Sequence, residues 1–255
     1  MKNIYDIFDI KGRKVLITGA ANGNGRAIAT AFGNAGSKLF LVDIDSDNLE
    51  IVSNDIEKET GSSVQRFVVD LSDSEEIDRF LSDNFDYDVV INNAGVTHSN
   101  HLSDYKDSDW DATYRVNLHA PYQIIKKVSK GMILKKSGSI INVTSLAAEF
   151  GFHGNPAYAA FKGALKQLTK AAACDLSADG IRVNSVGPGY IKTNMTSESW
   201  NDEEKRAQRS DRTLLGRWGE PDDLIGIMIF LASDASSYVT GQEFYVDGGW
   251  SARGL

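Results

Sequence analysis

Short apolar runs of strand length alternate with longer segments that carry apolar residues at helical spacing, and this alternation constrains the fold more than any other feature. The apolar runs occupy residues 15–17, 39–42, 67–69, 89–91, 140–143 and 182–186. The helical segments between them occupy residues 25–35, 46–60, 74–84, 108–135 and 157–177. Strands that alternate with helices are joined by right-handed crossovers, which give parallel strands with helices on both faces. The sequence therefore predicts a doubly wound α/β sheet.

The C-terminal part of the chain resumes this pattern after an interruption. A polar and charged segment at residues 193–213, called the lid segment below, follows Gly187-Pro188-Gly189. An apolar helix at 222–232 and an alternating strand at 243–246 then bring the expected number of strands to about seven. Because no repeat or low-complexity linker divides the chain, residues 1–255 are expected to form one domain. Ligands of such sheets bind beyond the carboxyl ends of the strands, where the lid segment would cover the substrate.

Composition excludes several classes of function. Lys and Arg number 27 against 35 Asp and Glu, and the formal charge of −8 repels nucleic acid and anionic membrane surfaces. No apolar run approaches the roughly 20 residues that a membrane-spanning helix needs. The lone Cys174, expected to be buried in an Ala-rich helix, permits no intrachain disulfide and fits a reducing cytoplasm. The four histidines lack Cys or carboxylate partners at ligand spacing, so no metal site is expected.

A glycine-rich turn stands where the first strand meets the first helix. Gly19, Gly23 and Gly25 let backbone N–H groups approach a pyrophosphate, whose charge a helix N-terminus favours. Asp43 ends the second strand, where its carboxylate suits the adenosine ribose hydroxyls and repels a 2′-phosphate. No Lys or Arg stands beside these positions, so NAD is favoured over NADP. Turn-forming glycines and a solvated Asp would explain the same residues without a ligand.

A phenol and an ammonium, Tyr158 and Lys162, stand four residues apart and hence on one face of a predicted helix. A close ammonium stabilises the phenolate and lowers the Tyr pKa, which suits a general acid/base acting on an alcohol or a carbonyl. Ser145 closes the preceding strand, where its hydroxyl can orient the phenol or the substrate oxygen. Taken singly, an exposed Tyr/Lys pair and a capping Ser are the alternative interpretations.

Together these motifs resemble the short-chain dehydrogenase/reductase family over nearly the whole chain. The resemblance is carried by the run Thr18-Gly-x-x-x-Gly-x-Gly25, by Asn92-Asn93-Ala94-Gly95, by Tyr158-x-x-x-Lys162 and by Pro188-Gly189. It implies a Rossmann-like fold and a nicotinamide cofactor bound by Gly19, Asn22, Gly23, Asn24, Gly25, Asp43, Asp70, Leu71, Asn93, Ala94, Gly95, Tyr158, Lys162, Pro188, Gly189, Ile191 and Thr193. Asn24 departs from the aliphatic residue usual beneath the nicotinamide, and Phe161 departs from the small residue usual before the Lys.

The same resemblance implies a catalytic tetrad of Asn117, Ser145, Tyr158 and Lys162. Tyr158 would exchange the proton of the substrate oxygen, and Ser145 would steady the developing oxyanion. Lys162 would lower the pKa of Tyr158 and hold the nicotinamide ribose. The backbone of Asn117 would help to hold a water that connects to Lys162.

The substrate candidates are Ser145, His98, Glu149, His153 and Tyr190, all expected in loops that follow strands. Several polar groups in one pocket disfavour a plain hydrocarbon alcohol, because a buried polar group without a partner costs about 1–3 kcal/mol. Within the family, residues 216–219 and 248–250 are most similar to members acting on sugars, sugar acids and polyols, gluconate 5-dehydrogenase among them. We therefore expect an NAD-dependent oxidoreductase that interconverts a secondary alcohol and a ketone, or a sugar hemiacetal and a lactone.

Two other functions fit the same sequence. A 3-oxoacyl-carrier-protein reductase that uses NADPH shares the motifs, although Asp43 argues against NADPH and the negative charge against an acidic carrier protein. A catalytically silent NAD-sensing or scaffold protein would keep the fold without the chemistry. The resemblance further implies a homotetramer or a homodimer with a small-molecule substrate, and the charge and the lack of a long apolar run exclude nucleic acid and membrane as partners.

Overall fold

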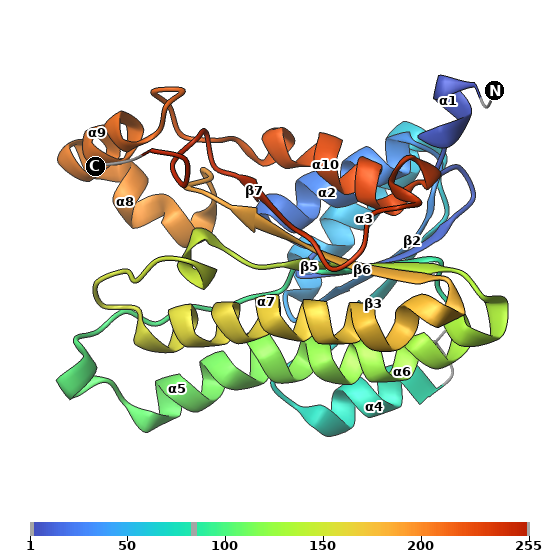
Figure 1. Ribbon diagram of the computed structural model, residues 1–255, viewed down its shortest axis with the longest axis horizontal. Coiled ribbons are helices and arrows are strands. Elements are labelled where there is room, and N and C mark those ends of the chain that lie inside the picture. The colour runs from blue at the N-terminus through green and yellow to red at the C-terminus, as the bar shows by residue number, and fades with distance from the viewer. Residues whose placement is uncertain (1–2, 83–85, 254–255) are drawn as a thin grey trace.

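Seven parallel strands form one sheet in the computed structural model, which describes residues 3–82 and 86–253. Their spatial order is β3-β2-β1-β4-β5-β6-β7 (Figure 1). The strands are β1 (Lys14–Thr18), β2 (Lys38–Asp43), β3 (Val64–Val68), β4 (Val89–Asn92), β5 (Gly138–Val143), β6 (Ile181–Pro188) and β7 (Glu243–Val246). The doubly wound, Rossmann-like architecture expected from the sequence is therefore confirmed.

Helices cover both faces of this sheet (Figure 1). The helices are α1 (Ile4–Ile7), α2 (Gly23–Asn34), α3 (Ser46–Thr60), α4 (Ser74–Ser82), α5 (Asp107–Tyr114), α6 (Ala120–Lys135), α7 (Pro156–Leu176), α8 (Ser197–Asn201), α9 (Glu203–Arg212) and α10 (Ile225–Ala232). Short 3₁₀ turns lie at Leu102–Asp104, Leu146–Ala148, Ser177–Asp179, Asn194–Thr196, Pro221–Leu224 and Asp234–Ser236. α2, α3 and α10 pack on one face of the sheet, and α4, α6 and α7 pack on the other.

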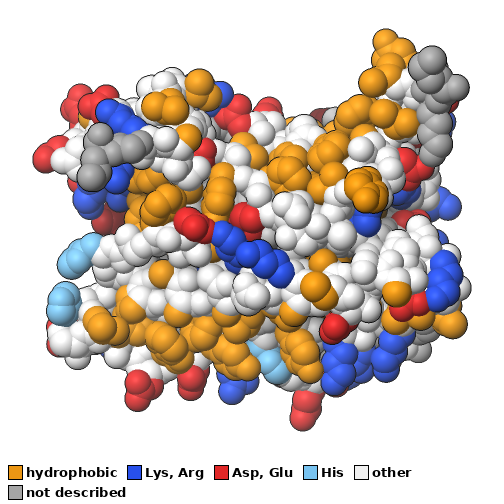
Figure 2. Space-filling view, viewed as in Figure 1, with side chains coloured by type: hydrophobic (Ala, Val, Ile, Leu, Met, Phe, Trp, Pro, Cys, Tyr) orange, Lys and Arg blue, Asp and Glu red, His pale blue; other side chains and the backbone are white. Residues whose placement is uncertain are grey.

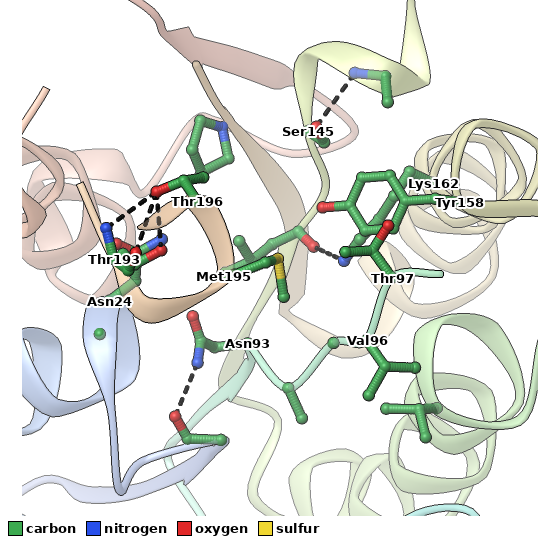
Figure 3. A pocket seen from close by; sticks show the side chains of 18 of the residues that line it. Asn24, Asn93, Val96, Thr97, Ser145, Tyr158, Lys162, Thr193, Met195 and Thr196 are labelled. Atoms are coloured by element: carbon green, nitrogen blue, oxygen red, sulfur yellow. Dashed lines mark hydrogen bonds between the residues drawn. The ribbon is translucent and has the colours of Figure 1, made fainter. Parts of the chain in front are cut away.

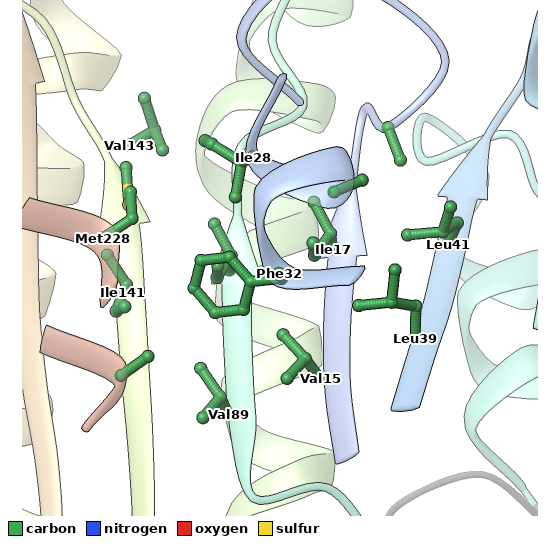
Figure 4. Close-up of a cluster of buried hydrophobic side chains, with 14 of the residues drawn as sticks. Val15, Ile17, Ile28, Phe32, Leu39, Leu41, Val89, Ile141, Val143 and Met228 are labelled. Atoms are coloured by element: carbon green, nitrogen blue, oxygen red, sulfur yellow. The ribbon is translucent and has the colours of Figure 1, made fainter. Parts of the chain in front are cut away.

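Successive residues of the central strands point to opposite faces, so each strand contributes to two hydrophobic clusters. On β1, Val15 and Ile17 pack with Phe32 of α2 and Met228 of α10 (Figure 4). Leu16 between them belongs to the cluster under α4, α6 and α7. All five side chains are fully buried. Strands that are buried on both faces need continuous apolar runs, which is why such runs identified the strands.

The helix expected at residues 108–135 is interrupted in the structure. α5 passes into a π-helical turn at Arg115–His119, and α6 follows without a break in the chain direction. Asn117 lies in this turn, with its side chain fully buried. A single π turn inside a longer helix is a local insertion that is frequent at functional sites.

Three smaller differences concern boundaries and burial. β3 begins at Val64, whereas the strand expected from the sequence began at residue 67. α4 ends at Ser82, and the last two residues of the helix expected at 74–84 lie outside the described residues. Cys174 is exposed, contrary to expectation, because the buried stripe of α7 runs through Ala172 and Ala173 instead.

The strand order places the candidate site. β2 and β3 lie on one side of β1 in the sheet, and β4 to β7 follow in order on its other side. Because all the strands are parallel, their carboxyl ends meet at one edge of the sheet. The loops after β1 and β4 leave that edge in opposite directions and open a crevice between them.

Candidate active site

A cleft of about 900 Å³ opens at the carboxyl edge of the sheet. The loops after β1 to β6 form its walls, and the lid segment contributes to one side. The predicted cofactor residues that line it are Gly19, Asn22, Gly23, Asn24, Asp43, Asp70, Leu71, Asn93, Ala94, Gly95, Tyr158, Lys162, Pro188, Gly189, Ile191 and Thr193. Gly25, predicted with them, is not among the residues that line the cleft.

The glycine turn after β1 is packed too tightly to admit side chains. Gly19 has a left-handed φ of 66°, and a Cβ there would lie 2.8 Å from the Cα of Ala94. A Cβ on Gly25 would collide with the carbonyl oxygen of Gly19. Asn93 donates from Nδ2 to the carbonyls of Thr18 (3.0 Å) and Gly19 (3.1 Å), which ties the β4 loop to the turn. At Gly19 and Gly25 the turn therefore has no room for a side chain, while Asn22 and Asn24 of the same turn line the cleft.

Three observations fit this end of the cleft to a dinucleotide. The turn opens α2, whose first N–H groups have no partner within the helix and stabilise an anion. Asn24 Oδ1 is buried without a hydrogen-bond partner among the described residues, so an incoming donor can satisfy it. Asp43 accepts hydrogen bonds from the N–H of Ala21 (2.9 Å) and of Asp45 (3.1 Å), which hold its carboxylate at the cleft wall.

Ser145, Tyr158 and Lys162 line the same cleft. Tyr158 and Lys162 lie one turn apart on α7, and Ser145 follows β5 and caps the next 3₁₀ turn. Figure 3 shows these side chains along one side of the cleft, with Thr193 of the lid segment across from them and Met195 between. The fold thus brings together three residues of the predicted tetrad from two separate elements.

Lys162 is almost completely buried. Its side chain is 3% exposed, and Nζ donates to the carbonyl of Val143 (2.7 Å). Burial disfavours the charged amine and lowers the pKa of Lys162 to about 8, and the negative charge of Glu243 opposes that shift. Glu243 on β7 accepts hydrogen bonds from Thr144 and Ser185, and burial raises its pKa. Sequence analysis missed Glu243, because an acidic residue in an alternating strand normally faces solvent.

The pKa of Tyr158 shifts in the direction opposite to our expectation. Burial raises the pKa of this phenol, and the Ser145 side chain acts in the other direction. Lys162 Nζ lies 5.6 Å from the centroid of the Tyr158 ring and donates its hydrogen bond to Val143. The ammonium therefore does not overcome the desolvation of the phenol, and the predicted lowering of the Tyr158 pKa is wrong.

Asn117 acts on the site from outside the cleft. Its side chain bonds the backbone of Val96, a residue of the loop after β4 that lines the cleft. Asn117 itself does not line the cleft. The predicted water held by the Asn117 backbone stays a prediction.

His98, His153 and Tyr190 line the cleft, as expected for substrate residues. The loops that carry the two histidines are joined, since Thr97 Oγ1 donates to Asn155 Oδ1 (2.9 Å). Tyr190 lies after β6 and packs edge-on against the ring of Phe152 from the second of these loops. Aromatic and polar groups therefore share the rim of the cleft.

Glu149 lies outside the cleft, and its prediction as a substrate residue is wrong. Its carboxylate forms an ion pair with Lys166 and accepts a hydrogen bond from Tyr245 Oη (3.1 Å). The 3₁₀ turn after Ser145 redirects the chain, so that Glu149 faces α7 and β7. The Lys166 ammonium holds the pKa of the Glu149 carboxyl below its usual range.

Arg209 of α9 lines the cleft and was not identified from the sequence. Its guanidinium carbon lies 4.6 Å from the centroid of the Tyr190 ring. α9 also carries Lys205, Arg206 and Arg212 and has no buried residue. A helix that is polar on all sides gives no periodicity from which one cation can be singled out.

The described part of the chain contains neither a cluster of metal-binding side chains nor a helix suited to span a membrane. Within residues 3–82 and 86–253, no group of three or more His, Cys, Asp or Glu side chains is arranged to hold a metal ion. The described helices include none with the length and apolar character required to cross a membrane.

Comparisons with known proteins cover almost the whole chain. A family model described as enoyl-(acyl carrier protein) reductase matches residues 19–251. A 5-keto-D-gluconate 5-reductase of Escherichia coli strain K12 is 34% identical over 96% of this chain and 97% of its own length. A 3-oxoacyl-[acyl-carrier-protein] reductase of Thermotoga maritima is 37% identical over 94% of this chain and 98% of its own. A gluconate 5-dehydrogenase of Burkholderia cenocepacia, solved with NADP and tartrate, superposes with a TM-score of 0.93 at 33% identity and covers 99% of this chain and all of its own.

Proposed function

The chain belongs to the short-chain dehydrogenase/reductase family of oxidoreductases that act on CH–OH groups, and we propose that it interconverts a hydroxyl and a carbonyl group of a sugar acid with NAD as cofactor. The carbonyl form is a ketone or, for a sugar hemiacetal, a lactone. The observation that carries the proposal is the meeting of Ser145, Tyr158 and the bare glycine turn in one cleft. A nicotinamide dinucleotide, when bound there, supplies the hydride acceptor or donor.

The residues of the tetrad have separate tasks in this proposal. Tyr158 exchanges a proton between its Oη and the substrate oxygen. Ser145 donates a hydrogen bond to that oxygen and stabilises its negative charge. Lys162 favours the phenolate while its amine is charged and donates to a ribose hydroxyl. Asn117 keeps the loop after β4 in place through its side chain.

Polar groups at the rim support a sugar acid as the substrate. His98 and His153 offer hydrogen bonds to hydroxyl groups, and Arg209 adds a positive charge. Two similar proteins agree with this chemistry: the Escherichia coli relative is named for 5-keto-D-gluconate, and the Burkholderia structure contains tartrate.

The choice of NAD over NADP rests on Asp43. Its carboxylate stands at the end of β2 beside the turn, where it would repel a 2′-phosphate. Of the described Lys and Arg residues, those lining the cleft are Lys162 and Arg209, and neither belongs to the loops after β1, β2 or β3. The Burkholderia structure contains NADP, so this preference is proposed from the residues of this chain.

An NADPH-dependent 3-oxoacyl-carrier-protein reductase is the second candidate function. The 37% identity with the Thermotoga maritima reductase favours it. The formal charge of −8 and the carboxylate of Asp43 oppose it, because carrier proteins are acidic and NADPH carries an additional phosphate. The silent NAD sensor or scaffold is a third candidate, which the retention of Ser145, Tyr158 and Lys162 opposes.

We also propose that the layer of α5, α6 and α7 forms an interface with a second copy of the chain, in a homodimer or homotetramer. Figure 2 shows hydrophobic side chains gathered over this layer. The exposed aromatic residues there are Trp110, Tyr114 and Tyr122. Exposed apolar side chains of this kind are typical of interfaces. Light scattering coupled to size exclusion tests the proposal, and a monomeric mass would refute it.

The free thiol supports the cytoplasm as the place of action. Cys174 is exposed, and an exposed single thiol is best preserved in a reducing compartment. Fractionation of the source cells tests this proposal, which recovery of the protein outside the cytoplasm would contradict.

The function is tested by following the absorbance of reduced nicotinamide. Purified protein is mixed with NAD or NADP and with gluconate, other aldonates, neutral polyols or 3-hydroxyacyl thioesters. Turnover of an aldonate with NAD supports the proposal. Turnover of acyl thioesters with NADP alone would establish the second candidate, and dinucleotide binding without any turnover would favour the sensor.

A further inference from the structure

Arg209 presents an unpaired hydrogen-bond donor at the substrate end of the cleft. The side chain is partly buried on α9 and lines the cleft. Its Nη1 is fully buried and has no hydrogen-bond partner in the part of the chain that the structure describes. A buried guanidinium N–H without an acceptor is unfavourable, because it has lost its hydrogen bonds to water and no protein hydrogen bond replaces them. A ligand with a hydrogen-bond acceptor would therefore be favoured at this position, where the described residues provide none.

Two other cations of this region, Lys205 and Arg217, are already paired with carboxylates. Lys205 forms ion pairs with Glu198 (3.4 Å) and Asp202 (3.5 Å). Arg217, just beyond the lid segment, binds both carboxylate oxygens of Asp223 (2.7 and 2.9 Å). Arg209 has no such carboxylate partner among the described residues. Its positive charge is consequently directed at the cleft and its contents.

An aromatic platform holds the guanidinium in place. The guanidinium of Arg209 lies over the ring of Tyr190, and its carbon is also 6.0 Å from the ring centroid of Trp218. Tyr190 in turn contacts Trp218 and Trp250, with ring centroids 5.2 Å apart in each pair. Stacking uses the face of the guanidinium and leaves its edge, which carries the N–H donors, free. The edge of such a planar fork matches the two oxygens of a carboxylate.

We propose that Arg209 binds the carboxylate of the substrate and thereby selects hydroxy acids over neutral sugars and polyols. The inference rests on the proposed function, because it places the reacting hydroxyl at Ser145 and Tyr158 in the same cleft. A carboxylate is favoured over a phosphate, since a doubly charged phosphate is usually held by several cations or by a helix N-terminus. Among the described residues lining the cleft, the other cation is Lys162, whose Nζ is engaged with Val143.

The test uses two ligands that differ at a single carbon. Gluconate carries a carboxylate where glucitol carries a hydroxymethyl group. Calorimetry on the cofactor-saturated protein measures the affinity for both, and steady-state kinetics measures kcat/KM for both. Arg209→Gln removes the charge, and Arg209→Lys keeps the charge but loses the planar fork. Arg212→Gln is the matched control, because Arg212 also lies on α9, stacks on Trp250 and does not line the cleft.

Arg209→Gln is expected to weaken gluconate binding about 10- to 100-fold while changing glucitol binding less than about threefold. Arg209→Lys should recover part of the loss, and Arg212→Gln should leave the ratio of the two ligands unchanged. Equal affinity of the wild type for both ligands, including no binding of either, overturns the proposal. So does an equal effect of Arg209→Gln on both. Inhibition by gluconate 6-phosphate that depends on Arg209 and exceeds the effect of gluconate would overturn the choice of a carboxylate.

The two proposals fail in distinguishable ways. Arg209-dependent binding of gluconate without turnover, with either cofactor, refutes the proposed function and leaves the role of Arg209 intact. Oxidation of gluconate with a kcat/KM that Arg209→Gln does not change refutes the role of Arg209 and leaves the proposed function intact. Circular dichroism and thermal melting of each variant show whether it is folded, and the Lys variant supplies the comparison if the Gln variant is not.

Discussion

Asn117 and Val96 exchange two hydrogen bonds between the π-helical turn and the loop after β4. The Asn117 Nδ2 donates to the Val96 carbonyl (2.7 Å), and its Oδ1 accepts from the Val96 N–H (2.9 Å). The side chain thus supplies hydrogen-bond partners to both backbone groups of Val96, which lies beyond the end of β4. Since Gly95 and Thr97 beside it line the cleft, the pair couples the π turn to the shape of the site.

Replacing Asn117 with Ala should loosen this loop. Two backbone groups lose their partners, and the free energy of unfolding should fall by about 2–4 kcal/mol. KM should rise as the loop moves. Urea unfolding and steady-state kinetics measure the two effects, with Asn34→Ala, at an exposed position, as control. An unchanged stability of Asn117→Ala would show that the exchange contributes little.

Tyr158→Phe should abolish turnover and preserve cofactor binding. The variant lacks the phenolic proton but keeps the ring, and general acid/base catalysis typically contributes about 10²- to 10⁴-fold. Stopped-flow kinetics and fluorescence titration with reduced dinucleotide separate the two properties. Tyr238→Phe, which alters a fully exposed phenol, is the control. Normal turnover of Tyr158→Phe would disprove the assignment of the acid/base.

Asp43→Asn should reduce the preference for NAD over NADP. The wild type should use NAD at least about tenfold better by kcat/KM, because a carboxylate beside a 2′-phosphate is repulsive. The variant removes that repulsion, so most of its gain should appear with NADP. Asp47→Asn removes an equal charge at an exposed position of α3 and should not change the ratio. A wild type that prefers NADP would contradict the proposed cofactor.

Lys162 should make the stability of the fold depend on alkaline pH. The folded pKa of about 8 lies below the unfolded value of 10.5, so between these values the unfolded chain binds a proton that the folded chain does not. Stability must then rise with pH across this window, and the penalty of the buried charge is present in full below pH 8. Relative to Lys162→Met, the wild type should gain about 2–3 kcal/mol between pH 7 and pH 10.

Urea unfolding at several pH values measures this gain. Tyr158 lies nearby and also titrates at high pH, so the comparison is made in a Tyr158→Phe background with and without Lys162→Met. Parallel curves for the two proteins would mean that Lys162 is protonated throughout.

Gly25→Ala should destabilise the fold and prevent dinucleotide binding. The added methyl group would meet the carbonyl oxygen of Gly19, and overpacking of this kind costs about 1–3 kcal/mol. Gly226→Ala on α10 meets no atom within 4 Å and should be neutral or stabilising by up to about 1 kcal/mol. Thermal unfolding and dinucleotide titration compare the two variants, and equal behaviour would refute the steric argument.

Prediction from the sequence succeeded where a residue's role depends on its local position. Tyr158 and Lys162 share a helix face by spacing alone, and Asp43 stands at the end of a strand that its apolar run defines. The π-helical turn could not be predicted, because the insertion of a single residue into a helix does not change the apolar pattern of the sequence in a recognisable way. Glu149 was misplaced because the direction of a side chain after a 3₁₀ turn depends on its partner, and Lys166 lies distant in sequence.

The sequence by itself determined the strand and helix order, the parallel sheet and the glycine turn, since each follows from apolar periodicity or from the size of a side chain. Only the tertiary structure decided which charges meet. It placed Glu243 near Lys162, turned Glu149 away from the cleft, and brought one of the cations of α9, Arg209, to the cleft wall. The physical reason is that the groups that can pair with a charge come from distant segments of the chain. Packing, and not local sequence spacing, decides which of these segments come together.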